Sequence, residues 1–139
     1  SELVIGMTPR SVAGDRQTRI LTLANTTTST TSVNLSDDGA TDSGGSIYVP
    51  TNSTMSVKGH VTGRKSDGTV HARFSVDALV HRVTANALID GQAVTEDFGL
   101  TSGYAVAFTA GSGGFKLQVT GVAATTVYWG ATLSIIEVA

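Results

Sequence analysis

The sequence contains no cysteine, only two prolines and few charged residues, and its apolar stretches are short. Of its 139 residues, 14% are charged and 6% are aromatic, and the formal net charge is −2. The absence of cysteine excludes disulfides, thiolate chemistry and cysteine-ligated zinc. A net charge so close to zero provides no general attraction to nucleic acid or to an anionic membrane. We therefore expect neither of these as a partner.

Small and β-branched residues alternate with polar ones along most of the chain, and helical periodicity is nearly absent. Turn signals recur at intervals of about ten residues, which is typical of an all-β domain. The longest uncharged stretch, Val119 to Ile136, also alternates and is interrupted by Thr, Gly and Tyr, unlike a transmembrane helix. The length favours one domain. We predict an antiparallel β-sandwich or jelly roll over residues 1–139, in which residues 1–18 can form an extended arm.

The clearest element is a hairpin whose strands flank the turn "KSDG" at residues 65–68. Its strands, 55–64 and 70–80, each place apolar residues on one face. A second hairpin is predicted at Asp90-Gly91, a pair that favours tight turns. It would join strands at 83–89 and 92–98. The other expected strands are 19–25, 31–35, 46–50, 104–109, 115–120 and 126–138, with a loop at 36–45.

The last strand carries apolar residues on both faces. Val127, Trp129, Ala131, Leu133 and Ile135 share one face, while Tyr128, Ile136 and Val138 lie on the other. We expect Trp129 in the core. A second apolar face in a small domain needs a cover, either a central place in a sandwich or a partner chain. We favour a partner for part of it, which makes Tyr128, Ile136 and Val138 candidate residues of a homo-oligomer interface.

Two groups of residues are candidates for ligand binding. The segment 55–82 has a local excess of positive charge, and its Arg64 and Arg73 could meet an anionic glycan, a phosphate or an acidic neighbour. Tyrosine rings at the surface are common platforms for sugars. We expect Tyr48 and Tyr104 in this role, with Tyr104 directly after the turn "TSG".

Catalytic chemistry and metal binding find little support. His60 and His71 are expected almost opposite each other across the hairpin, but no third ligand accompanies them and the same face carries cations. The neighbours Glu96 and Asp97 should point to opposite faces of a strand, so they cannot easily act together. No G-x-S-x-G motif occurs. We predict no catalytic residue, no metal site and no cofactor.

The segment "GGFKLQVTGVAATTVYWGATLSIIEV", preceded by "LVHRVTANALIDGQAVTEDFG", resembles the closing segments of tail-fibre and tailspike proteins of tailed bacteriophages. The resemblance covers roughly residues 55–139. It implies a virion component, usually a homotrimer, whose β-rich end domain contacts the host surface or locks three chains together. It brings no catalytic motif and no functional residue with it.

Residues and resemblance together predict a non-enzymatic virion protein. Its function would be attachment to a host-surface glycan, with bacterial polysaccharide as ligand, or trimerisation of a fibre. The alternative is a structural virion protein, such as a capsid decoration or head fibre, that contacts other virion proteins and has no ligand of its own. A polysaccharide hydrolase is the weakest interpretation, because no carboxylate pair is evident within one chain.

Overall fold

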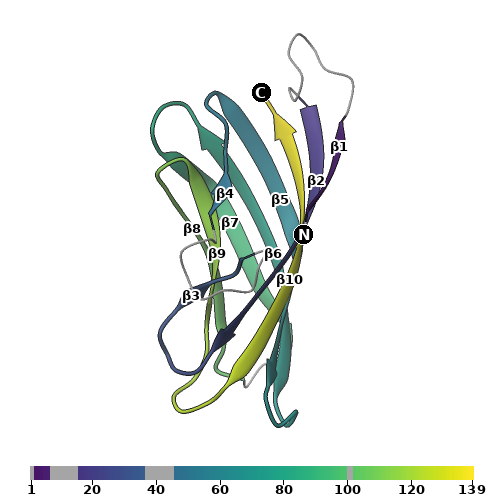
Figure 1. The fold of residues 1–139 in the computed structure, drawn as a ribbon, viewed down its shortest axis with the longest axis vertical. Helices are drawn as coiled ribbons and strands as arrows, with labels where there is room; N and C mark the ends of the chain where they lie inside the picture. Colours follow the sequence, from purple (N-terminus) through teal and green to yellow (C-terminus); the bar gives the residue numbers. More distant parts are fainter. Residues whose placement is uncertain (1, 7–15, 37–45, 100–101) are drawn as a thin grey trace.

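The computed structural model describes residues 2–6, 16–36, 46–99 and 102–139, with side chains described from residue 18 onward. Every regular element in this part of the chain is a β-strand, and every pairing is antiparallel (Figure 1). The all-β prediction is confirmed. The strands are β1 Glu2–Gly6, β2 Arg16–Thr27, β3 Val33–Asn34, β4 Ile47–Tyr48, β5 Ser53–Lys65, β6 His71–Arg82, β7 Ala87–Phe98, β8 Ala105–Gly111, β9 Gly114–Thr120 and β10 Val127–Val138.

Six strands form the larger sheet in the order β1-β2-β10-β5-β6-β7. Its strands β2, β10, β5 and β6 have 12 or 13 residues each and run the length of the molecule (Figure 1). Along β10, buried and exposed residues alternate without interruption. Since successive side chains of a strand point to opposite faces, this pattern gives the sheet one inner and one outer face. We call the exposed side the outer face of the six-stranded sheet.

The smaller sheet consists of β3, β4, β8 and β9 and lies over the inner face of the larger one (Figure 1). β8 pairs with β9 along its whole length. β3 pairs at one end of β9, through Val33 and Val119, and β4 pairs at the other end, through Ile47 and Phe115. Because a strand has only two edges, β3 and β4 must share the edge of β9 that β8 leaves free.

The two sheets are connected at both sides. On one side, the Gln92 side chain of β7 accepts a hydrogen bond of 2.9 Å from the Phe108 amide and donates one of 3.1 Å to the Phe108 carbonyl. On the other side, the backbones of Ala24 and Ser36 exchange two hydrogen bonds. These links satisfy backbone groups that would otherwise be unpaired at the sheet edges, so the sandwich is closed around its core.

The core between the sheets is mostly aliphatic and contains two groups of aromatic rings. Trp129 is 3% exposed, and its ring lies 6.5 Å from Phe74 and 5.3 Å from Tyr104, measured between ring centroids. Phe108 and Phe115 form a second, edge-on pair at 6.0 Å. The prediction that Trp129 lies in the core is confirmed, as are the inward faces of the hairpin strands β5 and β6.

The hairpin predicted at Asp90-Gly91 is wrong. β7 continues through both residues, and the register against β6 shifts there, from Gly91 opposite Leu79 to Ile89 opposite Val80. Asp90 is thus the extra residue of a β-bulge. Its carboxylate contacts His81 Nδ1 at 2.8 Å. Gly91 also lacks the positive φ that a tight hairpin turn requires.

The chain turns earlier, because residues 83–85 are bends and not strand. The loop predicted at 36–45 lies outside the described residues except for Ser36. Among the described residues there is no helix long and apolar enough to cross a bilayer.

Candidate functional site

Most of the large apolar side chains that the described residues expose lie on the outer face of the six-stranded sheet. By strand alternation and register, this face carries Ile20, Leu79, Leu88, Phe98, Tyr128, Ile136 and Val138. Scattered surface leucines are ordinary, but several on one flat sheet face are typical of a contact surface. The final strand therefore does have one buried apolar face and one exposed apolar face, as the sequence predicts.

Four of these residues gather at one end of the sheet, which we call the apolar end: Leu79, Leu88, Ile136 and Val138. Ile136 on β10 and Leu79 on β6 both lie opposite Ser56 on β5. Leu88 on β7 lies opposite His81 on β6. Ile136 and Val138 are 50% and 47% exposed. A groove of about 530 Å³ lies on the sheet surface over β10 and β5, and Ile136 is one of its lining residues. Small side chains between larger ones leave room for a partner's side chains to interdigitate.

Arg64 and Arg73 lie at the opposite end of the same face. Arg64 is opposite Tyr128 on β10 and His71 on β6. Arg73 Nε lies 3.6 Å from the Asp97 carboxylate, and its guanidinium lies over the Phe98 ring at 4.9 Å. The structure thus brings together Arg64, Arg73 and the predicted interface residue Tyr128. It does not bring Tyr48 or Tyr104 to them.

The surface position predicted for Tyr104 is wrong. Its side chain is 7% exposed and packs edge-on against Trp129. Its hydroxyl is buried without a hydrogen-bond partner among the described residues, and burial raises its pKa. The turn before it ends at Gly103, whose φ is +76°, so the chain re-enters the sandwich immediately. Tyr104 is therefore a core residue and is not accessible to a sugar.

Histidine, serine and aspartate meet in the middle of the outer face, but their order differs from that of a catalytic triad. Ser75 Oγ donates its hydrogen bond to the Asp97 carboxylate, while His60 Nδ1 lies 3.5 Å from Ser75 Oγ. In a triad the histidine takes the serine proton and the carboxylate orients the histidine. Here the Asp97 carboxylate, and not the histidine, accepts the hydrogen bond from the serine hydroxyl, so the histidine is not placed to act as its base.

The predicted proximity of His60 and His71 is also wrong, since His60 lies opposite Ser75 and His71 opposite Arg64. The hairpin loop spans residues 66–70, so the register differs from a symmetric turn about "KSDG". No three His, Asp or Glu side chains of the described residues are grouped to hold a metal. Glu96 and Asp97 point to opposite faces, as expected: Glu96 accepts a hydrogen bond from Ser102, and Asp97 from Ser75.

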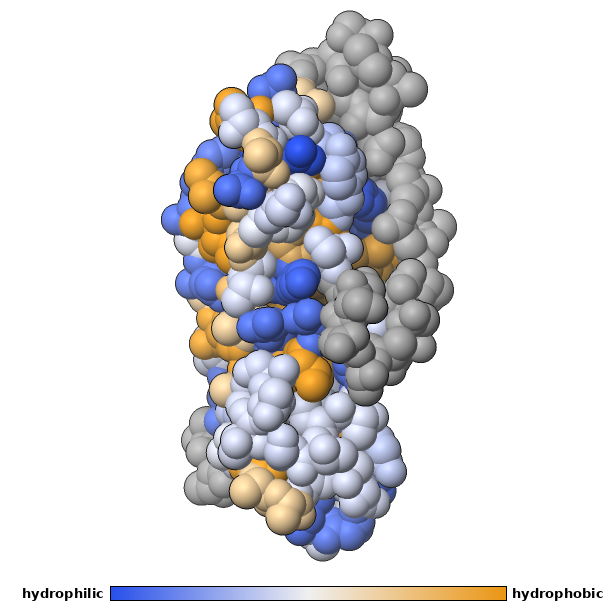
Figure 2. Space-filling view, turned by 60° about the vertical axis from the view of Figure 1, so that its left-hand side comes forward, coloured by the Kyte–Doolittle hydropathy of each residue, from blue (hydrophilic) through white to orange (hydrophobic). Residues whose placement is uncertain are grey.

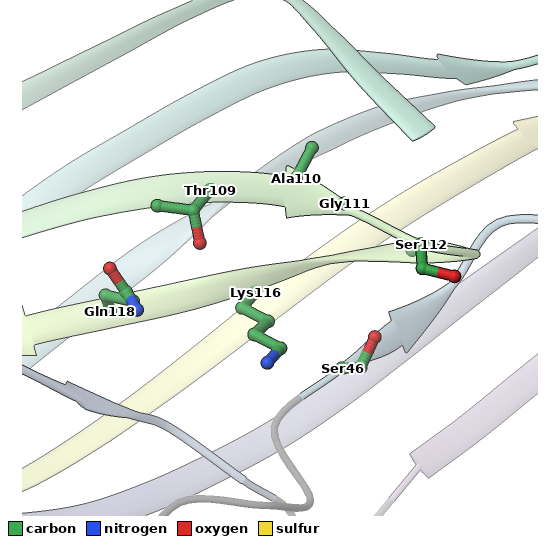
Figure 3. A pocket seen from close by; sticks show the side chains of 8 residues that line it. Ser46, Thr109, Ala110, Gly111, Ser112, Lys116 and Gln118 are labelled. Atoms are coloured by element: carbon green, nitrogen blue, oxygen red, sulfur yellow. The ribbon is translucent and has the colours of Figure 1, made fainter. Parts of the chain in front are cut away.

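The outer face of the smaller sheet has a different character. A trough of about 340 Å³ lies over the β8–β9 hairpin and the residue before β4 (Figure 3). Among the described residues, its lining contains no large apolar and no acidic side chain. The lining residues are Ser46, Thr109, Ala110, Gly111, Ser112, Gly114, Lys116 and Gln118. Figure 2, which brings this side of the molecule forward, shows mostly hydrophilic and intermediate colours there, with hydrophobic groups towards the left margin.

Tyr48 does not line this trough but lies next to one of its lining residues. It pairs with Gly114, which lines the trough, and its ring is 59% exposed. The Arg82 guanidinium lies over the ring at 5.6 Å and donates a hydrogen bond of 3.0 Å to the Val49 carbonyl. The structure therefore keeps Tyr48 as an accessible, supported ring, in agreement with the surface position predicted for it.

Sequence reasoning missed Lys116, the cation in this trough. The alternation of "GFKLQVT" places Lys116 and Gln118 away from the buried Phe115 and Leu117, so their outward position could have been found. The residues that surround them in space could not be found from the sequence. Ser46 lines the same trough as Lys116 because β4 pairs with β9, a contact between segments about 70 residues apart.

Comparisons with known proteins find a distant structural likeness. No family model matches the chain, and no curated protein matches it. Among solved structures, it is similar to the tailspike protein gp49 of the Acinetobacter baumannii bacteriophage Fri1, a capsular polysaccharide depolymerase. The TM-score is 0.48 and the sequence identity 13%. The likeness covers 96% of this chain and 19% of the tailspike, so the chain spans about a fifth of that protein's length.

Proposed function

We propose that this chain is a non-enzymatic module of a bacteriophage virion that serves in host-surface attachment or in trimerisation of a fibre, and that copies associate through the outer face of the six-stranded sheet. The observation that carries the proposal is the exposed apolar end of that face. The resemblance of residues 55–139 to the closing segments of phage tail fibres and tailspikes supports the virion context.

Association through this face must be by side-chain packing. β10 is paired with β2 on one edge and with β5 on the other along its whole length, so its backbone has no hydrogen bonds left to offer a partner. Covering the exposed halves of Ile136, Val138 and Leu79 stabilises association by about 1 kcal/mol per side chain. A symmetric oligomer repeats this contribution at each interface.

The non-enzymatic part of the proposal is supported by the pattern of hydrogen bonds at Ser75. Its hydroxyl proton is directed at Asp97 and not at His60. The alternative, a structural virion protein without its own ligand, uses the same apolar end against another virion protein. This structural alternative is favoured if the outer face of the six-stranded sheet is the only binding surface of the molecule.

The mass of the full chain in solution tests the proposal. Sedimentation equilibrium from nanomolar to micromolar concentration should show reversible self-association to a trimer. A monomer throughout this range would overturn association through the outer face. Binding to intact bacteria then separates the two candidates: selective binding to particular strains supports attachment, whereas binding only to purified capsids supports the structural alternative.

A further inference from the structure

The trough on the smaller sheet combines one positively charged side chain with neutral polar groups. Lys116 lies in its middle, and no carboxylate of the described residues is within ion-pair distance of its ammonium group. The other two lysines differ: Lys58 lies 3.9 Å from Asp77 and Lys65 lies 3.2 Å from Asp67. The described lining residues provide hydroxyl and amide groups around this one positive charge, and none of them is acidic.

Two glycines are among the residues that line the trough. Gly111 and Gly114 lie opposite each other and form its floor beside Tyr48. Thr109 lies opposite Lys116 on β8, while the hydroxyl of Ser46 lies on the same side of the hairpin as the Lys116 side chain (Figure 3). A sugar ring could therefore rest on the glycines, with one face near the exposed Tyr48 ring and its hydroxyl groups within reach of polar side chains.

A second cation reinforces the same end of the trough. Arg82 Nη1 lies near Gly113, at 3.8 Å from the position of a Cβ on that residue, and the guanidinium supports the Tyr48 ring. Among the described residues, Arg82 donates its hydrogen bonds to neutral carbonyl groups, at Val49 and Thr84. Its charge therefore adds to the positive potential that Lys116 creates, and both favour a negatively charged ligand.

We propose that this trough binds a saccharide unit that carries a carboxylate, with Lys116 contacting the carboxylate and Tyr48 contacting the ring. This inference rests on the attachment function proposed above, for which it specifies a site and a ligand class. It assigns ligand recognition to the smaller sheet and leaves the outer face of the larger sheet for association.

The test uses the full chain and a panel of uronic-acid-containing oligosaccharides, each paired with its carboxyl-reduced form. Calorimetric titration with monovalent oligosaccharides avoids avidity. At least one acidic oligosaccharide should bind, and carboxyl reduction should weaken it about tenfold, the effect of losing one charge-assisted hydrogen bond. Lys116→Gln should weaken the acidic form equally and should bind the acidic and reduced forms alike. The matched charge control, Lys65→Gln, should keep the wild-type affinities.

Three results would overturn the proposal: no oligosaccharide binds, Lys116→Gln still prefers the acidic form, or inorganic phosphate at equal concentration competes, which would indicate a general anion site. The mass measurement separates this failure from that of the proposed association. An oligomer that binds no acidic sugar refutes only the trough, whereas a monomer that binds one refutes only the association.

Discussion

The indole Nε1 of Trp129 donates a buried hydrogen bond of 2.9 Å to Thr27 Oγ1 and so joins the ends of β10 and β2. Thr27 is 1% exposed, so water cannot replace it as acceptor. Trp129 is also the residue on which Phe74 and Tyr104 pack. One hydroxyl therefore fixes the orientation of the largest ring in the core.

Thr27→Val should destabilise the fold by about 1–3 kcal/mol, because it preserves shape but leaves the indole N–H buried without an acceptor. Thr27→Ser keeps the hydroxyl and should lose distinctly less. Chemical denaturation followed by tryptophan fluorescence measures both. A loss of less than about 0.5 kcal/mol in Thr27→Val would show that the hydrogen bond contributes nothing.

Tyr104→Phe should leave the free energy of unfolding unchanged or raise it. The hydroxyl is buried without a partner among the described residues, so its removal eliminates a desolvation cost and no hydrogen bond. Tyr104→Ala, by contrast, removes the ring beside Trp129 and should cost about 3–5 kcal/mol. A loss of more than about 1 kcal/mol in Tyr104→Phe would reveal a hydrogen bond to the hydroxyl.

Strand alternation predicts the core well because it is a local property. In β5, β6 and β10 most of the inward-facing residues are apolar and alternate with polar ones, so the sequence alone identifies the inward faces and the place of Trp129. The failures concern features that depend on register. Asp90-Gly91 has the composition of a tight turn, but pairing with β6 converts it into a bulge.

The candidate site was predicted only in part for the same reason. Tyr48 was correctly expected at the surface, but Tyr104 follows a turn that leads inward, and local composition does not show this direction. The trough joins Ser46 to the β8–β9 hairpin, and Tyr48 lies beside it opposite Gly114; these segments come together through the pairing of β4 with β9. No pattern within a single segment indicates such a contact.

Glu137→Gln should destabilise the fold by at least about 1 kcal/mol and by less than the roughly 3–5 kcal/mol of a fully buried pair, since it leaves the partly buried Arg19 without its countercharge. Glu137 continues the buried face of β10 and is 4% exposed, and its carboxylate is paired with the Arg19 guanidinium. Thermal denaturation of Glu137→Gln measures the loss. The double variant Glu137→Leu with Arg19→Met, which removes both charges, should recover most of the stability. If it is less stable than Glu137→Gln, the pair itself contributes net stability.

Ile136→Lys should raise the dissociation constant of the oligomer at least about tenfold, because association would bury a charge at the apolar end. The position is half exposed in one chain, so the fold itself should tolerate lysine. Ala105→Lys, at an exposed position on the smaller sheet, is the matched control and should associate normally. Sedimentation equilibrium compares the two. Equal association of both variants would place the interface elsewhere.

Gly111→Val should abolish saccharide binding without destabilising the fold. A Cβ on Gly111 has no other atom within 4 Å, so the new side chain projects into the open floor of the trough, and a β-branched residue suits a strand. The neighbouring glycine cannot serve for this purpose, since a Cβ on Gly114 would lie 2.3 Å from the Ile47 carbonyl oxygen. Gly130→Val adds the same side chain in open space on the opposite sheet and should keep the affinity for monovalent sugar. If Gly111→Val binds the acidic oligosaccharides as well as Gly130→Val does, the ligand does not occupy the trough, whatever the effect of replacing Lys116.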